Sequence, residues 1–266
     1  MKNFFNPYAP IGTTEREEIG ISAFILVLLV WAGITGLDFI DPNKLPSPLA
    51  VIKAFGYLAY NDDHSILLSA TLASMQRIGL AALFVIFIGV PFGVLLGASP
   101  KLSAFFSPLI DPFRSAPVVA LLPLFVMWLG IGEEMKVAFL FTSAVVYVIP
   151  LVRDAMLGVP YTYWEGTRDL GATHVECILK GVLPIAAPRI FDACIVATSI
   201  LWTYITVAEY VNADSGLGQV IQNARRFSAM DQVLAGIIVI IALALITVVL
   251  LTFIRRKVYF WDGVSR

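Results

Sequence analysis

The chain has 266 residues, of which 59% are hydrophobic and 14% are charged, and its formal net charge is −1. A soluble domain carries roughly a quarter charged residues and at most about half apolar ones, and a core of this size cannot hide so much apolar surface. The balanced charge gives no basic excess for a nucleic-acid partner. The two cysteines, Cys177 and Cys194, provide neither a disulfide framework nor a paired zinc spacing. The composition therefore predicts an integral membrane protein in contact with membrane lipids.

The segment before the first apolar stretch predicts the start of a helix. Thr14 and Glu17 have the spacing of a capping box and lie directly before the apolar residues. Residues 1–18 carry three glutamates around Arg16 instead of a compact basic region, and no small-residue cleavage site follows. We therefore expect no cleaved signal peptide.

Six uncharged apolar stretches are the candidate membrane spans: Ile19–Leu37, Ile78–Pro100, Ser115–Gly132, Val137–Val152, Ala193–Ala208 and Gln232–Ile254. A helix needs about 17–25 residues to cross the hydrocarbon. The fourth and fifth stretches are shorter, so we expect their helices to continue past the flanking charges, which can reach the interface. Lipid-facing strands would alternate apolar and polar residues. The sequence therefore predicts an all-α polytopic membrane bundle of six transmembrane helices, in a single domain over residues 1–266.

The loop charges predict the orientation of this bundle. With six crossings both termini share one side, which carries twelve of the 18 Lys and Arg residues against five on the other, with Arg77 at the edge of a span. Cytoplasmic loops carry the excess of basic residues, so we expect both termini in the cytoplasm. Residues 159–188 then form the main cytoplasmic loop.

Helix-breaking residues recur inside or beside the spans, at Gly89, Pro91, Gly93, Pro117, Pro123 and Pro150. Such residues are tolerated where a cavity or a neighbouring helix satisfies the freed backbone groups. Small residues also allow helices to pack closely. The sequence leaves pore lining and simple packing equally open.

The fifth span carries a polar stripe, with Trp202 beside Thr198, Ser199, Thr203 and Thr206. This stripe is a candidate for pore lining, with interhelical hydrogen bonding as the alternative. Arg77 and Arg114 adjoin apolar segments, where a charge costs energy unless it is paired or hydrated. Each is a candidate functional residue, but each can also reach lipid headgroups, and Arg114 can pair with Asp111.

The 159–188 loop predicts a short amphipathic helix at the cytoplasmic face, stopped by Pro184 and Pro188. From spacing alone, an ordinary connecting helix is as good an interpretation as a functional one. Glu165, Gly171, Leu183 and Pro184 have the spacing of the "EAA" loop of ABC importer permeases, which this loop resembles. Gly166, Thr167 and Gly181 depart from that motif, although the spacing is intact.

The resemblance extends over roughly residues 40 to 260, in the same order. The segments 45–48, 111–117, 122–124, 128–133, 208–209 and 216–218 are similar to the sulfonate, taurine, nitrate and bicarbonate branch of the binding-protein-dependent permeases. The resemblance implies a type I importer permease in a bacterial inner membrane, forming half of a translocation pathway. It also implies a second permease copy as a homodimer, two ATP-binding cassette subunits, and a periplasmic or lipid-anchored substrate-binding protein.

We expect no catalysis by this chain. It has no G-x-x-x-x-G-K-[ST] phosphate cradle, so ATP and Mg would be bound by the partner subunits. His174, Glu176 and Cys177 lie close in sequence but offer too few ligands for a metal site. The residues expected to couple the permease to its ATPase are Glu165, Asp169, Leu170, Gly171, Ala172 and Thr173. We expect Gly171 to allow close backbone approach and Glu165 to complement the dipole at the helix start.

The candidate translocation-pathway residues are Arg77, Arg114, Thr198, Trp202, Thr206 and Glu209. The two arginines favour an anionic solute, while a neutral heterocyclic nutrient remains an alternative. An ion-coupled secondary transporter is the other alternative class. Such proteins usually have internal repeats and buried midplane carboxylates, and we find neither in the sequence.

Overall fold

The computed structural model describes residues 12–37, 39–60, 65–211 and 214–262, and within these ranges every regular element is a helix. Five of the described helices are long and apolar enough to cross a membrane. A bent pair of shorter helices makes a sixth crossing if it is counted as one span. The all-helical membrane bundle predicted from the sequence is confirmed.

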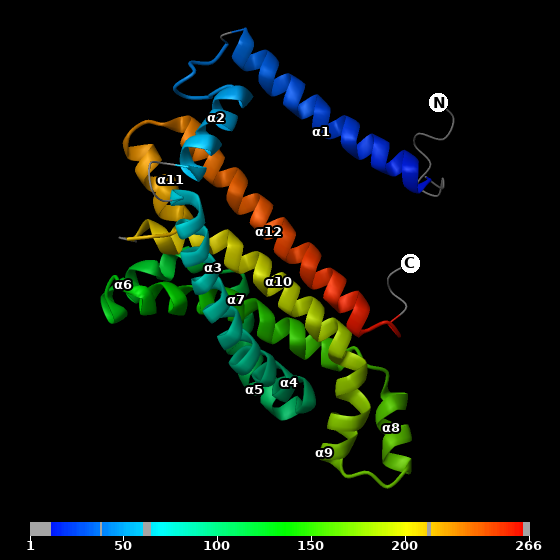
Figure 1. Ribbon diagram of the computed structural model, residues 1–266. Helices are drawn as coiled ribbons and strands as arrows, with labels where there is room; N and C mark the ends of the chain where they lie inside the picture. Colours follow the sequence, from blue (N-terminus) through cyan, green and yellow to red (C-terminus); the bar gives the residue numbers. More distant parts are fainter. Residues whose placement is uncertain (1–11, 38, 61–64, 212–213, 263–266) are drawn as a thin grey trace.

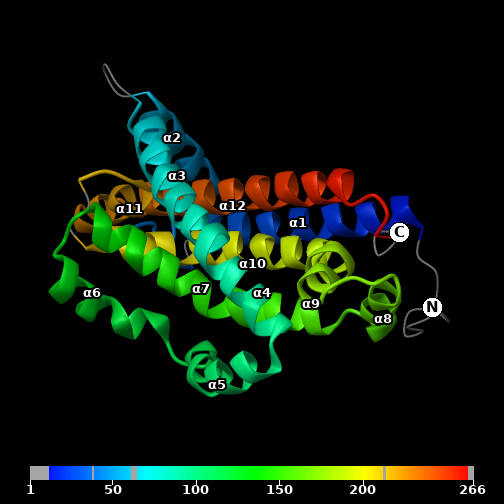
Figure 2. The same cartoon turned by 90° about the horizontal axis from the view of Figure 1, so that it is seen from below.

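The long helices are α1 (Thr13–Gly36), α3 (Ile66–Phe84), α7 (Glu133–Leu157), α10 (Leu183–Tyr210) and α12 (Met230–Val258). α7 and α10 continue past their flanking charges, as expected from their short apolar stretches. These two helices supply much of the buried core, including Phe139, Leu140, Leu201 and Ile205. α12 and α1 lie on one side of the α7–α10 pair (Figure 2).

The second span begins earlier than predicted. The hydroxyl of Ser65 accepts the backbone N–H of Leu68 at 3.1 Å and caps α3 at Ile66. From there the helical segment continues for 33 residues to Ala98. Arg77 therefore lies well inside a span, and its prediction at a span edge is wrong. The charge interrupts the apolar pattern without ending the helix.

Beyond α3 the chain passes through a π-helical turn, η1 (Val85–Gly89), into α4 (Val90–Ala98). A π turn here accommodates Pro91, which has no N–H to donate. A Cβ atom added to Gly93 would lie 2.7 Å from the Cβ of Val152 on α7. This glycine therefore permits close packing of α4 on α7, which supports the packing interpretation at this position.

The third apolar stretch does not form one span. The stretch itself forms η3 (Val118–Leu121) and α6 (Leu122–Leu129), and α5 (Pro100–Ile110) and η2 (Asp111–Arg114) precede it. The two arms, Pro100–Arg114 and Val118–Leu129, are bent by 96°. Prolines disfavour the helical conformation in the preceding residue and remove a backbone donor, and Pro112, Pro117 and Pro123 lie at or next to the bend. The predicted bounds are therefore wrong, because Ser115–Gly132 contains only the second arm of this bent pair.

Two short helices, α2 (Pro48–Ala59) and α11 (Leu217–Arg226), lie at one end of the bundle (Figure 1). Neither helix was predicted from the sequence, because both are too short to cross a membrane. α11 is strongly amphipathic, and its buried residues are Leu217, Gly218, Val220, Ile221 and Ala224.

The predicted cytoplasmic loop forms α8 (Tyr161–Asp169), α9 (His174–Glu176) and the π-helical η4 (Cys177–Val182), which leads into α10. These elements lie at the end of the bundle opposite α2 and α11 (Figure 1). Pro184 and Pro188 lie inside the first turns of α10 instead of stopping a helix. The prediction that they end the loop helix is wrong.

α1 packs loosely on the rest of the chain, and none of its candidate membrane-spanning window is buried. Its described link to the bundle is the indole N–H of Trp31, which donates to the carbonyl of Pro46 at 3.1 Å. α1 begins at Thr13 with Gly12 as its N-cap residue, so Thr14 lies in the first turn. The predicted Thr14–Glu17 capping box is therefore wrong.

Candidate functional site

Glu209 lies near the end of α10 and is almost fully buried, with 1% of its surface exposed. Its carboxylate accepts hydrogen bonds from the hydroxyl of Ser74 at 2.7 Å, from Arg77 Nη1 at 2.6 Å and from the backbone N–H of Gly218 at 2.7 Å. A buried carboxylate is costly unless it is paired and hydrogen-bonded. Here three donors from α3 and α11 satisfy it.

Arg77 extends this site to α7. It is 4% exposed and forms a two-point ion pair with Glu133, from Nε to Oε2 at 2.6 Å and from Nη2 to Oε1 at 2.7 Å. Nη1 also donates to the backbone carbonyl of Ser215 at 2.7 Å. Glu133 in turn accepts from Lys136 Nζ at 2.8 Å. We call Ser74, Arg77, Glu133, Lys136 and Glu209 the ion-pair cluster.

The charges of the ion-pair cluster cancel, because two carboxylates face two cations. Lys136 is buried within it and pairs with Glu133, whose side chain is 60% exposed. A fully paired cluster costs little overall, but removal of one partner leaves an uncompensated buried charge, at a cost of about 3–5 kcal/mol. The cluster therefore joins the middle of α3 to the start of α7, the end of α10 and the start of α11.

Two glycines allow α11 to approach Glu209. A Cβ atom on Gly218 would lie 2.7 Å from the Cβ of Glu209, and one on Gly216 would overlap its carboxylate. Gly216 also has a φ of +124°, which side-chain-bearing residues rarely adopt. The Ala208-Glu209 and Gly216-Leu217-Gly218 segments of the sequence therefore belong to one structural unit.

The structure joins two of the six predicted pathway residues, Arg77 and Glu209, in an ion pair. Glu133, Lys136 and Ser74 complete the site and were missed. Since these three are separated from Glu209 by long stretches of chain, no local spacing marked them. The flanking charges of the fourth span were the available signal.

Arg114 is exposed at the end of η2, and its backbone carbonyl accepts from the hydroxyl of Tyr147 at 3.3 Å. Its proposed partner Asp111 instead pairs with Arg153, at 3.2 Å. The expected Arg114–Asp111 pair is therefore wrong. α7 supplies Arg153 because this helix continues past its apolar stretch.

The polar stripe of α10 is satisfied within its own helix. The hydroxyls of Thr198, Ser199 and Thr203 each donate to the carbonyl four residues earlier, at 3.0 to 3.2 Å. Because each of these hydroxyls already donates its hydrogen, it can only accept a further hydrogen bond from another group. Thr206 is half-buried one turn before the ion-pair cluster.

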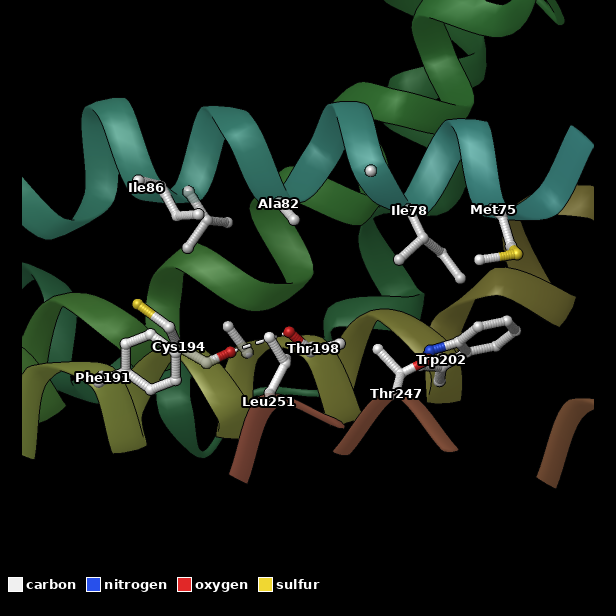
Figure 3. A pocket seen from close by; sticks show the side chains of 13 residues that line it. Met75, Ile78, Ala82, Ile86, Phe191, Cys194, Thr198, Trp202, Thr247 and Leu251 are labelled. Atoms are coloured by element: carbon white, nitrogen blue, oxygen red, sulfur yellow. Dashed lines mark hydrogen bonds between the residues drawn. The ribbon is translucent and has the colours of Figure 1, made fainter. Parts of the chain in front are cut away.

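Thr198 and Trp202 line an apolar cavity of about 420 Å³ between three helices (Figure 3). α3 contributes Met75 and Ile78, and α12 contributes Thr247. Trp202 is 3% exposed, and among the described residues none accepts a hydrogen bond from its Nε1. The described lining includes no charged side chain. An anion placed here would lack a counter-charge, so this cavity suits an apolar occupant.

α8, the following turn, α9 and η4 form a second candidate site, residues 161–182, which we call the coupling hairpin. Leu170 ends α8 and is 89% exposed at the turn. Gly171 has a φ of +85°, and a Cβ atom there would meet nothing within 4 Å. Within this chain Gly171 permits the left-handed turn, and close approach of an ATPase at this open position stays a prediction. Glu165 lies in the middle of α8, so its expected place at the helix start is wrong.

Local contacts fix the shape of the coupling hairpin. Thr173 and Glu176 form a capping box at the start of α9, and Lys180 Nζ donates to Glu176 at 2.9 Å. The rings of Trp164 and His174 stack with their centres 5.7 Å apart. These contacts give His174 and Glu176 structural roles.

Gly181 also contributes to the hairpin, because a Cβ atom there would lie 2.5 Å from the hydroxyl oxygen of Thr167 on α8. The isoleucine usual at this place in the EAA motif would not fit against α8 here. This contact accounts physically for two of the departures from the motif, Thr167 and Gly181.

Comparisons with known proteins place these features in a family. A family model described as the binding-protein-dependent transport system inner membrane component matches residues 89–259. The taurine transport system permease protein TauC of Escherichia coli (strain K12) is 31% identical over 258 residues, covering 94% of this chain and 92% of that protein. The nitrate import permease protein NrtB of Leptolyngbya laminosa is 25% identical, covering 94% of this chain and 91% of that protein.

Solved structures have the same fold. An inward-facing form of the MetNI methionine ABC transporter matches with a TM-score of 0.60 and 24% identity, over 73% of this chain and 94% of that chain. An amino acid ABC transporter crystallised with histidines matches with a TM-score of 0.58 and 19% identity, over 79% and 97%. The resemblance drawn from the EAA spacing is confirmed: the chain belongs to the binding-protein-dependent transport system inner membrane components, the permeases of ABC importers.

Proposed function

We propose that this chain forms, as a single transmembrane domain, half of the translocation pathway of an ATP-driven importer. A second copy supplies the other half. Two ATP-binding cassette subunits bind ATP and Mg and contact the coupling hairpin. A substrate-binding protein delivers the solute on the opposite side of a bacterial inner membrane.

The coupling hairpin is the observation that carries this proposal. It projects beyond the bundle at one end (Figure 1) and places Leu170 at the exposed turn. Its capping box, its ring stacking and the close contact at Gly181 give it a defined shape. A rigid helix between two spans can transmit a movement of an ATPase into the membrane. Leu170 is an apolar side chain that a groove on such a partner would bury.

The coupling residues divide by position within the hairpin. Glu165 and Asp169 lie on exposed positions of α8, Leu170, Gly171 and Ala172 form the turn, and Thr173 caps α9. We assign contact with the ATPase to the turn, and we assign support of the turn to Thr173.

We propose a small anionic or zwitterionic solute of the taurine, sulfonate, nitrate or bicarbonate kind. The names of the relatives support this choice, since TauC is a taurine permease protein and NrtB a nitrate import permease protein. The putative aliphatic sulfonates permease protein SsuC of Bacillus subtilis (strain 168), 28% identical over 89% of this chain, agrees with it. Uptake of labelled taurine, an alkyl sulfonate, nitrate and bicarbonate into proteoliposomes containing the whole complex tests the choice, with a neutral pyrimidine as control. Uptake of the neutral compound alone would contradict it.

Gly171→Trp tests coupling. The substitution adds a bulky ring at the turn and strains a position with a φ of +85°. We expect it to abolish uptake and substrate-stimulated ATPase activity while the subunits still assemble. Gly171→Asn is the matched control, because asparagine tolerates this conformation and is smaller, and it should retain most activity. Full activity of Gly171→Trp would make the hairpin a plain connector.

Reporter fusions test the orientation. A reporter fused after Arg266 should be cytoplasmic and one inserted near Asn61 should be external, since the loop charges place both termini in the cytoplasm. Both reporters on one side would remove a span and place the coupling hairpin out of reach of an ATPase.

A further inference from the structure

The apolar cavity of Figure 3 continues into a second apolar cavity of about 660 Å³. Ile86, Phe191 and Cys194 line both, and they lie at the end of the first cavity that is away from Trp202 (Figure 3). From there the second cavity follows α4 and the start of α10 as far as Tyr259. The described lining of the two cavities includes no charged side chain. We call the two cavities together the long groove.

α12 faces the long groove with residues at helical spacing. Thr247 and Leu251 line the first cavity, and Tyr259 lines the second. Positions four apart on a helix share a face, so Arg255 lies on this face between Leu251 and Tyr259. The face of α12 therefore changes from apolar to charged within about two turns.

A charge cluster lies at this end of the long groove. Arg255 Nε and Nη2 donate to the two carboxylate oxygens of Asp192, each at 3.0 Å, and Nη2 also donates to Asp262 at 2.5 Å. Two carboxylates share one cation here, and the side chain of Asp192 is still 49% exposed. Arg256 and Lys257 follow directly in the chain and are exposed, and no described carboxylate pairs with them. This end therefore offers spare acceptors together with two free cations.

The distance from these charges to the far end of the long groove fits one leaflet of a membrane. Asp192 and Trp202 are ten residues apart on α10, which corresponds to about 15 Å along a helix. The hydrocarbon core of a bilayer is about 30 Å thick, and a lipid chain occupies one leaflet of it. An acyl chain that begins beside the charge cluster therefore ends near Trp202.

We propose that the long groove binds one acyl chain of a phospholipid whose headgroup carries a primary ammonium, as in phosphatidylethanolamine. Guanidinium and ammonium groups bind phosphate, so Arg256 and Lys257 suit the phosphate of this lipid. The carboxylates of Asp192 and Asp262 suit its ammonium, which a purely anionic headgroup lacks. The proposal rests on the proposed function in one respect, namely that this end of the bundle lies in the cytoplasmic leaflet.

A photoreactive lipid tests the site. The purified whole complex in phosphatidylcholine nanodiscs receives a trace of phosphatidylethanolamine with a diazirine midway along one acyl chain, and peptide mapping after illumination locates the attachment. We expect attachment to concentrate on groove residues such as Ile86, Cys194 and Thr198. An excess of unlabelled phosphatidylethanolamine should suppress it about 10-fold more than the same excess of phosphatidylglycerol, which has the phosphate but no ammonium.

Two variants separate the chain from the headgroup. Cys194→Phe fills the junction of the two cavities, and Arg256→Gln with Lys257→Gln removes both free cations while the Arg255 pairs remain. Each should lower the attachment in the groove about 10-fold. Arg225→Gln with Arg226→Gln is the matched control, because it removes two exposed cations at the other end of the bundle, and it should leave the attachment unchanged.

Three results would overturn the proposal. One is attachment spread evenly over the lipid-facing helices, and another is equal suppression by the two unlabelled lipids. The third is an absence of attachment in the long groove, as expected if α1 of a second copy covers it. Attachment requires neither ATP nor solute, so the uptake measurements test the proposed function separately.

Discussion

Polar side chains stabilise each end of this bundle, but they do so in different ways. At the α11 end, Arg77 bonds to Glu209 across 132 residues of chain and Ser74 bonds to Glu209 across 135. In the coupling hairpin, Thr173 bonds to Glu176 across three residues and Lys180 to Glu176 across four. The first arrangement makes four helices depend on one another, whereas the second shapes one exposed element from within.

The two arrangements suit different roles: the hairpin can move as a unit, and the ion-pair cluster fixes helices relative to one another. A helix hairpin shaped by its own contacts can change position as a unit without loss of its structure. The ion-pair cluster, by contrast, cannot open without leaving the buried charges of Arg77 and Glu209 unpaired. We therefore expect substitutions at the α11 end to change the free energy of unfolding and substitutions in the hairpin to change coupling.

The largest effect is expected from breaking the ion-pair cluster on one side. Glu209→Leu leaves Arg77 buried with one carboxylate lost, and we expect the free energy of unfolding to fall by about 3–5 kcal/mol. Arg77→Met with Glu209→Leu removes both charges and leaves Glu133 paired with Lys136. The double variant should recover part of the loss, as measured by unfolding in detergent.

Glu134→Gln is the control for the cluster, because this neighbouring carboxylate is exposed and its loss should change little. Equal losses in Glu209→Leu and in the double variant would indicate that packing, and not charge pairing, sets the stability of this end.

A smaller effect is expected where helices hold together by close packing alone. Gly93→Ala places a methyl group 2.7 Å from the Cβ of Val152, and we expect a loss of about 1–3 kcal/mol in the free energy of unfolding. Gly79→Ala on the same span meets nothing within 4 Å and should stabilise the helix by up to about 1 kcal/mol. A loss of the same size at both glycines would contradict the packing interpretation.

The hairpin should respond locally. Thr173→Ala removes the capping hydroxyl of α9, which typically costs about 0.5–2 kcal/mol. We expect faster hydrogen exchange at the amides of α9 with no change in α10. Thr173→Ser keeps a hydroxyl and is the control. Faster exchange throughout α10 would indicate that the hairpin and the bundle unfold together.

The sequence predicted the parts of this fold that depend on near neighbours. Apolar length was enough to find five spans, and the resemblance to the EAA loop singled out the segment that folds as the hairpin. The predicted helix boundaries were wrong at prolines, because a proline can lie inside a helix or at a bend. Pro184 lies within α10, whereas Pro117 accompanies a sharp bend, and the difference depends on what each proline packs against.

The ion-pair cluster could not be predicted from the spacing of residues along the sequence. Arg77 interrupts an apolar stretch and therefore reads as the end of a span, although Glu209 pairs with it inside the bundle and Glu133 pairs with it at the exposed start of α7. Only the packing of α3 against α7 and α10 brings these charges together. Glu209 and Arg77 were found as separate candidates, but their partnership required the structure.

The smallest effect is expected in the apolar cavity between the two ends of the bundle. The Nε1–H of Trp202 is buried there, and no described residue accepts a hydrogen bond from it. An unsatisfied buried donor costs roughly 1–3 kcal/mol. Trp202→Phe removes that cost but also loses packing area, so we expect the free energy of unfolding to change by less than about 1 kcal/mol. Uptake should also stay close to the wild-type level, because the described lining of the cavity has no charge to attract an anion. Thr198→Val is the matched variant on the same wall. If either substitution abolished uptake in a complex of normal stability, the cavity would be part of the translocation pathway, as the polar stripe first suggested.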